Sequence, residues 1–249
     1  MSRQPPVLLK VLGHDVRWKL VTALARGDRR VQELVSLVEE PQNLVSYHLK
    51  QLRAAKLLAE RRSSADARDI YYSLNLERLQ VLYSDVGSAL HPALARPHRP
   101  ATSRTGQVAS HQPLRVLFLC TENNARSQMA EAILRQASGP TVQVFSAGTA
   151  PSAVHPLALH TLVQMGIDIS QQQAKHVDTF QYQSFDYIIT VCDRARESCP
   201  IVSENAETIH WSLADPAAVV GNKAQAQAFA QTAEQLMVRI RYFIALTYK

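Results

Sequence analysis

Cysteine is scarce in this sequence, and long apolar runs are absent. The 249 residues contain three cysteines, Cys120, Cys192 and Cys199, and an odd, small number argues against a disulfide framework and for thiol chemistry. No apolar run approaches the ~18 residues of a transmembrane helix. The first residues also lack the apolar core of a secretory signal. The sequence therefore predicts a cytoplasmic globular protein that does not enter a membrane.

The positive charge is spread unevenly along the chain. Residues 1–90 carry a net charge of +4, residues 91–113 carry +3 without an acidic residue, and residues 114–249 carry −1, within a total of +6. A basic first part favours a polyanion as partner. Residues 91–113 contain four prolines and show no periodicity, which indicates a flexible linker. Two domains are therefore predicted, 1–90 and 114–249, joined by the linker 91–113.

The first predicted domain is a series of short helices followed by a hairpin. Asp15 is expected to cap a helix over Val16–Arg26, which Gly27 ends. Pro41 suits the first turn of a third helix, and Asn75 is placed to cap the last one. Strands at residues 57–62 and 70–74 enclose a polar tip. The apolar positions that fit the helices are Val31, Leu34, Val35 and Val38 in the second, Val45, Leu49 and Leu52 in the third, and Leu76, Leu79, Tyr83 and Val86 in the last.

The other positions of the third helix suit contact with DNA. They offer hydrogen-bond donors, cations and an aromatic ring, the chemistry that reads base edges and binds phosphates. A small helical bundle with a solvated basic face is the alternative, but the order of helices and hairpin favours a winged helix-turn-helix. The DNA-binding candidates are Gln42, Asn43, Ser46, Tyr47, Lys50 and Arg53 on the helix and Arg61, Arg62 and Arg68 in the hairpin.

The stretch PQNLVSYHLKQLRAAKLL and the following YY-containing strand resemble the α+β winged helix-turn-helix of the ArsR/SmtB-type repressors. The resemblance implies a homodimer paired through its terminal helices, with residues 42–54 in the major groove of an operator and residues 61–68 at the backbone or minor groove. Members that sense arsenite carry a cysteine pair before the recognition helix. Residues 29–37 read RRVQELVSL, so a thiolate metalloid site is excluded there.

The second predicted domain holds a cysteine and an arginine at a strand-to-helix junction. Cys120 and Arg126 are separated by five residues, and Ser127 follows. Loop amides and a helix N-terminus would bind an anion, and Arg126 would grip a tetrahedral oxyanion. This positive field predicts a lowered pKa for Cys120, with Ser127 donating a hydrogen bond to its sulfur. The oxyanion-binding candidates are Thr121, Glu122, Asn123, Asn124, Ala125 and Arg126, among which Asn123 tolerates a left-handed backbone.

A bare Cys-x5-Arg also occurs by chance, but the pattern around it supports a site. Further strands are predicted at Val142–Ala147, Phe185–Cys192 and Glu207–Leu213, with helices at 155–166, in the 170s and from Lys223 onward. This alternation predicts an α/β domain whose parallel sheet carries helices on both faces. Cys120, Cys192 and Asp215 would then meet at the carboxyl ends of the strands. The apolar face of the last helix would hold Phe229, Leu236, Ile240 and Phe243 or Ile244.

Residues 114–249 resemble the low-molecular-weight tyrosine phosphatase fold and, within it, the thioredoxin-coupled arsenate reductases. Gln128 stands where phosphatases have proline, and Asp215-Pro216 is followed by alanines instead of tyrosines. Cys192-x6-Cys199 matches the reductases' second and third cysteines. The resemblance implies that Cys120 attacks arsenate while Asp215 protonates the leaving oxygen. The disulfide then passes through Cys192 to Cys199, and thioredoxin reduces it. The polar segment Asp193–Ser198 has few anchors and is expected to rearrange as the relay proceeds.

No tightly bound cofactor is predicted. Asn123, Glu131 and Ser146 match positions that hold potassium in some of these reductases, and a solvated carboxylate is an equal alternative for Glu131. Three functions remain open at this point: an arsenate reductase fused to a DNA-binding regulator, a regulator whose second domain senses an oxyanion or thiol state, and a phosphatase for phosphotyrosine or phosphoarginine. The alanines after Pro216 disfavour the phosphatase.

Overall fold

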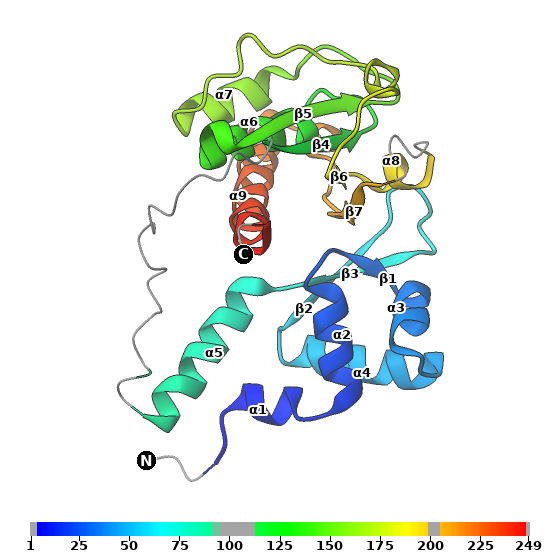
Figure 1. Ribbon diagram of the computed structural model, residues 1–249, viewed down its shortest axis with the longest axis vertical. Coiled ribbons are helices and arrows are strands. Elements are labelled where there is room, and N and C mark those ends of the chain that lie inside the picture. The colour runs from blue at the N-terminus through cyan, green and yellow to red at the C-terminus, as the bar shows by residue number, and fades with distance from the viewer. Residues whose placement is uncertain (1–3, 92–93, 95–112, 199–204, 248–249) are drawn as a thin grey trace. The chain divides into compact units, whose positions relative to one another are not determined.

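A computed structural model of the chain describes residues 4–91, 94, 113–198 and 205–247. The chain forms two compact units, Met1–His111 and Gln112–Lys249, whose α-helices and β-strands are labelled in Figure 1. Most of the predicted linker 91–113 lies outside the described residues, as does Cys199. In the part of the chain that is described, no helix is both long and apolar enough to cross a bilayer.

The first unit is a winged helix-turn-helix. Its helices and strands are α1 (Val7–Leu12), α2 (Asp15–Leu24), β1 (Arg29–Arg30), α3 (Val31–Val38), α4 (Gln42–Ala54), β2 (Leu58–Arg62), β3 (Ile70–Leu74) and α5 (Leu76–Leu90). The predicted stripe of α4 is confirmed, because Val45, Leu49 and Leu52 are all buried. Burying one such side chain stabilises the fold by roughly 1.5–3 kcal/mol, so this stripe holds α4 with its opposite face turned to solvent.

Four details of the first unit differ from the sequence prediction. The side chain of His14, not Asp15, caps α2, and this helix ends at Leu24. Pro41 precedes α4 instead of forming its first turn. The wing gains a third strand, because β1 pairs with β3 in the order β1-β3-β2. Tyr83 is 73% exposed, and Leu82 takes the buried position of α5 in its place, between Leu79 and Val86, which pack against the core as predicted.

The second unit is an α/β domain around a parallel sheet with the strand order β5-β4-β6-β7. Its elements are β4 (Leu114–Cys120), α6 (Arg126–Ser138), η2 (Gly139–Thr141), β5 (Val142–Gly148), α7 (Pro156–Gln164), η3 (Val177–Phe180), β6 (Tyr187–Thr190), α8 (Asp193–Ser198), β7 (Glu207–His210), η4 (Pro216–Ala218) and α9 (Asn222–Thr247). β6 and β7 are shorter than predicted.

The two faces of this sheet are covered differently. Alternate residues of a strand point to opposite faces, so Val116 and Phe118 join the core with α6 and α9, whereas Leu117 and Leu119 join a smaller cluster. The smaller cluster is closed by the short 3-10 helix η3 together with loop residues. The helix predicted in the 170s is therefore present only as this 3-10 helix at Val177–Phe180. The inward residues predicted for α9 are buried, with Phe243 in preference to Ile244: Phe229, Leu236, Ile240 and Phe243.

Candidate active site and candidate DNA-binding surface

The loop between β4 and α6 turns its peptide N–H groups inward. The carbonyls of Thr121, Glu122 and Asn124 accept hydrogen bonds of 2.8–2.9 Å from backbone N–H groups in the segment 150–155. A trans peptide directs the following N–H to the opposite side, so the N–H groups of the next residues face the loop interior. The Asn123 N–H, for example, donates to Cys120 Sγ at 3.1 Å. This arrangement suits an anion.

Two backbone features allow the loop to close this tightly. Asn123 adopts the left-handed conformation expected from the sequence, with φ of 47°. Gly148 ends β5 directly against the loop, and a Cβ there would lie 2.5 Å from the Thr121 carbonyl oxygen. Any side chain at position 148 would therefore push the loop out of place. The sheet and the loop are packed as one unit.

Burial dominates the electrostatics of Cys120, which is 2% exposed. Burial raises the pKa of the Cys120 thiol, and the neighbouring Cys192 raises this pKa further. Ser127, whose Oγ is 2.9 Å from Sγ, lowers it, as do Arg126 and the Asn123 N–H. The net direction is opposite to the sequence prediction. The physical reason is that two hydrogen-bond partners of the sulfur and the charge of Arg126 replace only part of the solvation that burial removes.

Arg126 and Asp215 form an ion pair in this structure. Arg126 is 7% exposed, and its Nη2 donates to Asp215 Oδ2 at 2.9 Å while Nη1 donates to the Leu213 carbonyl at 3.0 Å. The other carboxylate oxygen of Asp215 accepts from the Ala217 N–H at 3.1 Å, which starts η4. The structure thus brings the expected oxyanion-binding cation and the expected proton donor together. The ion pair also offsets part of the positive field that the sequence placed at Cys120.

Cys192 lies just beyond the end of β6 and borders the same loop. Its side chain is 1% exposed, and Sγ lies 3.4 Å from Thr121 Oγ1, on the residue next to Cys120. The Ala195 N–H donates to Cys192 Sγ at 3.3 Å. Two of the three predicted redox cysteines therefore lie close together, at the carboxyl ends of the neighbouring strands β4 and β6. The third, Cys199, lies outside the described residues.

A buried polar cluster that the sequence did not indicate anchors α8. Asp193, at the start of α8, and His210, at the end of β7, are both fully buried. His210 Nε2 lies 3.2 Å from Asp193 Oδ1, which also accepts from Ser212 Oγ at 2.8 Å. The expectation that Asp193–Ser198 has few anchors is therefore wrong at its first residue. His210 had no role assigned from sequence, since only the sheet pairing brings it to Asp193.

Glu122 and Asn124, two of the oxyanion-binding candidates, turn their side chains to the outer segment 150–155. Asn124 Nδ2 donates to Glu122 Oε2 at 2.6 Å and to Ser152 Oγ at 3.1 Å. The two side chains thus bond to each other and to the outer segment. Thr121 is likewise directed toward Cys192. Recognition of an anion by this loop would depend on its backbone and on Arg126.

The residues matched to a potassium site do lie together. Asn123 Nδ2 donates to Ser146 Oγ at 2.9 Å, and Ser146 donates to Glu131 Oε2 at 2.5 Å. Glu131 is 4% exposed, so its alternative interpretation as a solvated carboxylate is wrong. Among the described residues, no group of three or more His, Cys, Asp or Glu side chains could hold a metal ion.

The polar face of α4 is open to solvent. All six candidates on this helix are exposed: Gln42, Asn43, Ser46, Tyr47, Lys50 and Arg53. Arg53 is paired with Glu60 of β2 at 2.6 Å, and Arg68 with Asp66 at 2.6 Å, a contact that lowers the pKa of Asp66 to about 2. These two arginines therefore share their charge with carboxylates. In the wing, Arg61 Nη1 and Arg62 Nη1 donate to backbone carbonyls of the hairpin.

A histidine on the buried side of α4 was also not recognised from the sequence. His48 is 2% exposed, and its ring lies 4.2 Å from that of His14, the residue that caps α2. This contact ties α4 to the start of α2. Burial, the nearby His14 and Arg17 together lower the pKa of His48.

Comparison with known proteins matches both units. Residues 115–246 match the family "Low molecular weight phosphotyrosine protein phosphatase", and residues 14–60 match "Bacterial regulatory protein, arsR family". An arsenate reductase of Halalkalibacterium halodurans is 36% identical over 129 residues, which is 51% of this chain and 93% of that protein. One of Bacillus subtilis is 35% identical over 116 residues, 47% of this chain and 84% of that protein.

Solved structures were matched as well. A structure described as "An arsenate reductase in the phosphate binding state" covers 53% of this chain and 97% of its own, with 28% identity and a TM-score of 0.47. The matches to the arsenate reductases cover about half of this chain. The arsR-family match, at residues 14–60, precedes the phosphatase-family match at residues 115–246.

Proposed function

The chain belongs to the low molecular weight phosphotyrosine protein phosphatase family and carries an arsR-family segment ahead of that domain; on this premise we propose that it reduces arsenate to arsenite and binds DNA as a regulator. The observation that carries the reductase is the neighbouring position of Cys120 and Cys192, linked through Thr121. A phosphatase needs one nucleophilic cysteine, whereas reduction of As(V) to As(III) takes two electrons, which two thiols supply on forming a disulfide. The curated relatives named above are arsenate reductases.

The first step uses the loop and the ion pair. The loop N–H groups and the Arg126 guanidinium would hold the arsenate oxygens, which draws Arg126 from Asp215 toward the anion. Once Arg126 has moved to the anion, Asp215 takes up the proton that the Cys120 thiol releases. The Cys120 sulfur then forms an S–As bond, while the As–O bond to one hydroxyl group breaks and that group leaves as water with the proton from Asp215. Ser127 donates to the Cys120 sulfur as it becomes a thiolate.

The second step moves the electron pair. Cys192 attacks the Cys120 sulfur, an S–S bond forms, the S–As bond breaks, and arsenic leaves as arsenite. Cys199 would then displace Cys120 from Cys192. Thioredoxin reduces the Cys192–Cys199 disulfide. In the starting geometry, Thr121 and the Ala195 N–H support the Cys192 sulfur, and the cluster around Asp193 fixes the first turn of α8.

Gln128 stands where the phosphatases that this domain resembles have proline, and this difference favours the reductase over a phosphatase of phosphotyrosine or phosphoarginine. It is fully buried and its Nε2 donates to Asn123 Oδ1 and to the Gln173 carbonyl, both at 3.0 Å. It therefore holds the left-handed residue of the loop. The alanines that follow Pro216 also provide no aromatic wall for a phosphotyrosine ring.

The regulatory half of the proposal is operator binding by a homodimer. The exposed polar face of α4 would enter the major groove, and the wing would contact the backbone. The described part of the first unit contains no cysteine, so it offers no thiolate site for a metalloid. Sensing would rest on another ligand or on the second unit.

The test compares two reactions of the full chain. Arsenate-dependent NADPH oxidation is measured with thioredoxin and thioredoxin reductase, beside hydrolysis of para-nitrophenyl phosphate. Cys120→Ser should abolish both activities. Cys192→Ser should reduce arsenate turnover to background yet retain ester hydrolysis, which needs Cys120 alone and thus controls for folding.

Three outcomes would contradict the proposal. Normal arsenate turnover in Cys192→Ser would exclude the relay. Ester hydrolysis without arsenate turnover in the parent chain would favour a phosphatase. Absence of both reactions from the parent chain would favour a regulator whose second unit senses an oxyanion or a thiol state.

A further inference from the structure

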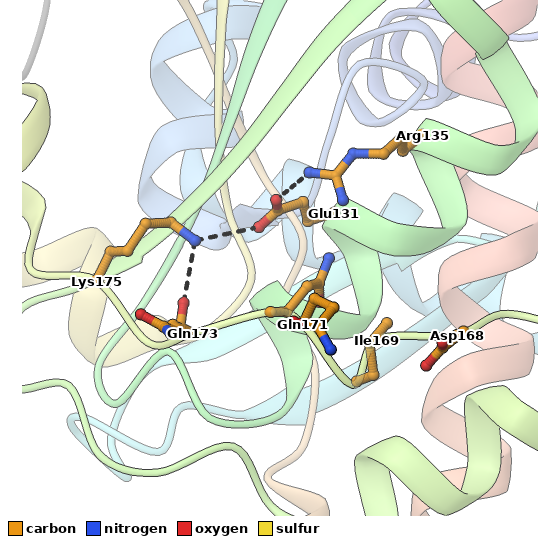
Figure 2. Close-up of a pocket in the computed structure, with 8 residues that line it drawn as sticks. Glu131, Arg135, Asp168, Ile169, Gln171, Gln173 and Lys175 are labelled. Carbon is orange, nitrogen blue, oxygen red and sulfur yellow. Dashed lines mark hydrogen bonds and ion pairs between the residues drawn. The ribbon is translucent and has the colours of Figure 1, made fainter.

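Glu131 is a buried carboxylate that is already balanced by cations of the chain. It lies in α6, close to the loop, and Arg135 one turn later contacts its Oε1. Lys175 Nζ lies 3.8 Å from its Oε2 and donates to the Gln173 carbonyl at 3.0 Å. Figure 2 shows Arg135 and Lys175 reaching Glu131 from two sides. A carboxylate buried to this degree needs such partners to remain charged.

The hydrogen bonds that lead from Glu131 to Cys120 have only one consistent direction. A carboxylate can only accept, so Ser146 donates to Glu131 and accepts from Asn123 Nδ2. Asn123 Oδ1 accepts from the Lys175 N–H at 2.8 Å, and a backbone N–H can only donate, which fixes the orientation of this amide. The second proton of Nδ2 goes to Ser127 Oγ at 2.8 Å. The Ser127 hydroxyl proton is then directed at the Cys120 sulfur.

This arrangement does not fit a potassium ion at the residues matched to such a site. Asn123 turns its NH2 group, not its oxygen, toward Ser146, and hard cations bind through oxygen. Its oxygen is used by Lys175 and Gln128. A potassium ion on Glu131 Oε2 would also lie beside the ammonium of Lys175 and be repelled by it.

We propose that Lys175 is a positioning residue that takes the place of a bound monovalent cation. Its ammonium neutralises Glu131 and its peptide N–H fixes Asn123, so that Ser127 points its proton at Cys120. The proposal rests on the proposed function in one respect, because Cys120 is the nucleophile of that reaction. Lys175 nevertheless lies outside the loop between β4 and α6 that would bind the anion.

Solvent can reach this position from one side. A surface cavity of about 390 Å³ is lined by residues that include Glu131, Arg135, Asp168 and Lys175. Removal of the ammonium would leave Glu131 facing this cavity. A dissolved cation could then enter and take over the charge that Lys175 supplied.

The experiment exchanges the tethered cation for a dissolved one. The parent chain and Lys175→Met are compared in potassium chloride and in sodium chloride at equal ionic strength. The parent should show the same unfolding temperature and kinetics in both salts. In sodium chloride, Lys175→Met should unfold roughly 2–4 °C below the parent and show a kcat/KM for arsenate that is ~10-fold or more lower. In potassium chloride, both differences from the parent should be smaller.

Two further variants separate charge from shape. Lys175→Arg keeps the charge and should stay indifferent to potassium. Lys223→Met removes an exposed lysine at the start of α9 and should behave as the parent. A parent chain that itself responds to potassium over sodium, a Lys175→Met chain with parental properties, or a loss that potassium does not restore would each overturn the proposal.

The unfolding measurement needs no turnover. If the protein does not reduce arsenate, the potassium-dependent stability of Lys175→Met, together with its ester hydrolysis, still tests Lys175. A failed reductase assay and a failed cation exchange are therefore distinguishable.

Discussion

At the scale of single residues, the properties of Cys120 come from competition between burial and hydrogen bonding. Its sulfur receives the Asn123 N–H and lies within hydrogen-bond distance of Ser127, yet it is almost fully buried. Burial prevails, so the pKa of the thiol is raised. The Cys120 thiolate therefore forms at a higher pH than an ordinary thiolate, and the reaction rate with an alkylating agent should increase with pH as the thiolate forms.

Two substitutions should move the pH dependence of Cys120 alkylation in opposite directions. Ser127→Ala removes a donor that lowers this pKa, so alkylation by iodoacetamide at pH 8 should slow about fivefold, the equivalent of one hydrogen bond of ~1 kcal/mol. Cys192→Ser removes a group that raises it, so alkylation should become faster. Peptide mapping identifies the modified cysteine. Ser138→Ala, at the other end of α6, is the control. Equal profiles for Ser127→Ala and the parent would show that Ser127 does not support the thiolate.

At the scale of elements, α4 combines a buried stripe with an exposed polar face. Val45, Leu49 and Leu52 attach the helix to the core, and the opposite side stays open. The cations on this face are not equivalent, because Arg53 shares its charge with Glu60 of β2. Lys50 is exposed and precedes that pair by one helical turn. It is thus the better candidate for a phosphate contact.

The affinity for DNA should distinguish these two cations. With a mixed-sequence duplex, Lys50→Ala should weaken binding and reduce the slope of log affinity against log salt concentration by about 1. Arg53→Ala should change the slope less, because Glu60 already offsets its charge. Fluorescence anisotropy over a salt series measures both, with Lys223→Ala as a control in the second unit. An unchanged slope in Lys50→Ala would remove this helix from the proposed DNA contact.

At the scale of the whole molecule, the two units have separate cores. The first core is built from residues of α1 to α5 and β2, and the second from residues of β4 to α9. Among the residues that the structure describes, none belongs to both cores. Each unit can therefore bury its apolar surface without the other, which is the condition for independent unfolding.

Calorimetry of the full chain should accordingly show two transitions. Under the proposed function phosphate would bind the native loop between β4 and α6, so it should raise only the transition of the second unit. At about one hundred times the dissociation constant, the gain of ~2.7 kcal/mol corresponds to a shift of roughly 5–10 °C. Chloride at equal ionic strength is the control. A single transition, or an equal shift of both, would show that the units unfold together.

Local patterns in the sequence were sufficient for the order of elements, the stripe of α4, the wing and the strand–loop–helix at Cys120. These features depend on residues a few positions apart, whose periodicity and turn chemistry act locally. The left-handed Asn123 and the capping by Asn75 belong to the same class, and both are confirmed. The same patterns predicted a helix in the 170s, which the structure has only as the 3-10 helix η3.

Tertiary structure decided what depends on distant residues. Arg126 meets Asp215 across 89 positions and Lys175 meets Asn123 across 52, distances along the chain over which no periodicity acts. His210 reaches Asp193 only because β6 and β7 pair in one register. The pKa of Cys120 is likewise a sum over everything packed around its sulfur. Sequence determined the chemical groups at this site, and the fold determined their solvation and partners, because desolvation and charge pairing are properties of packed atoms.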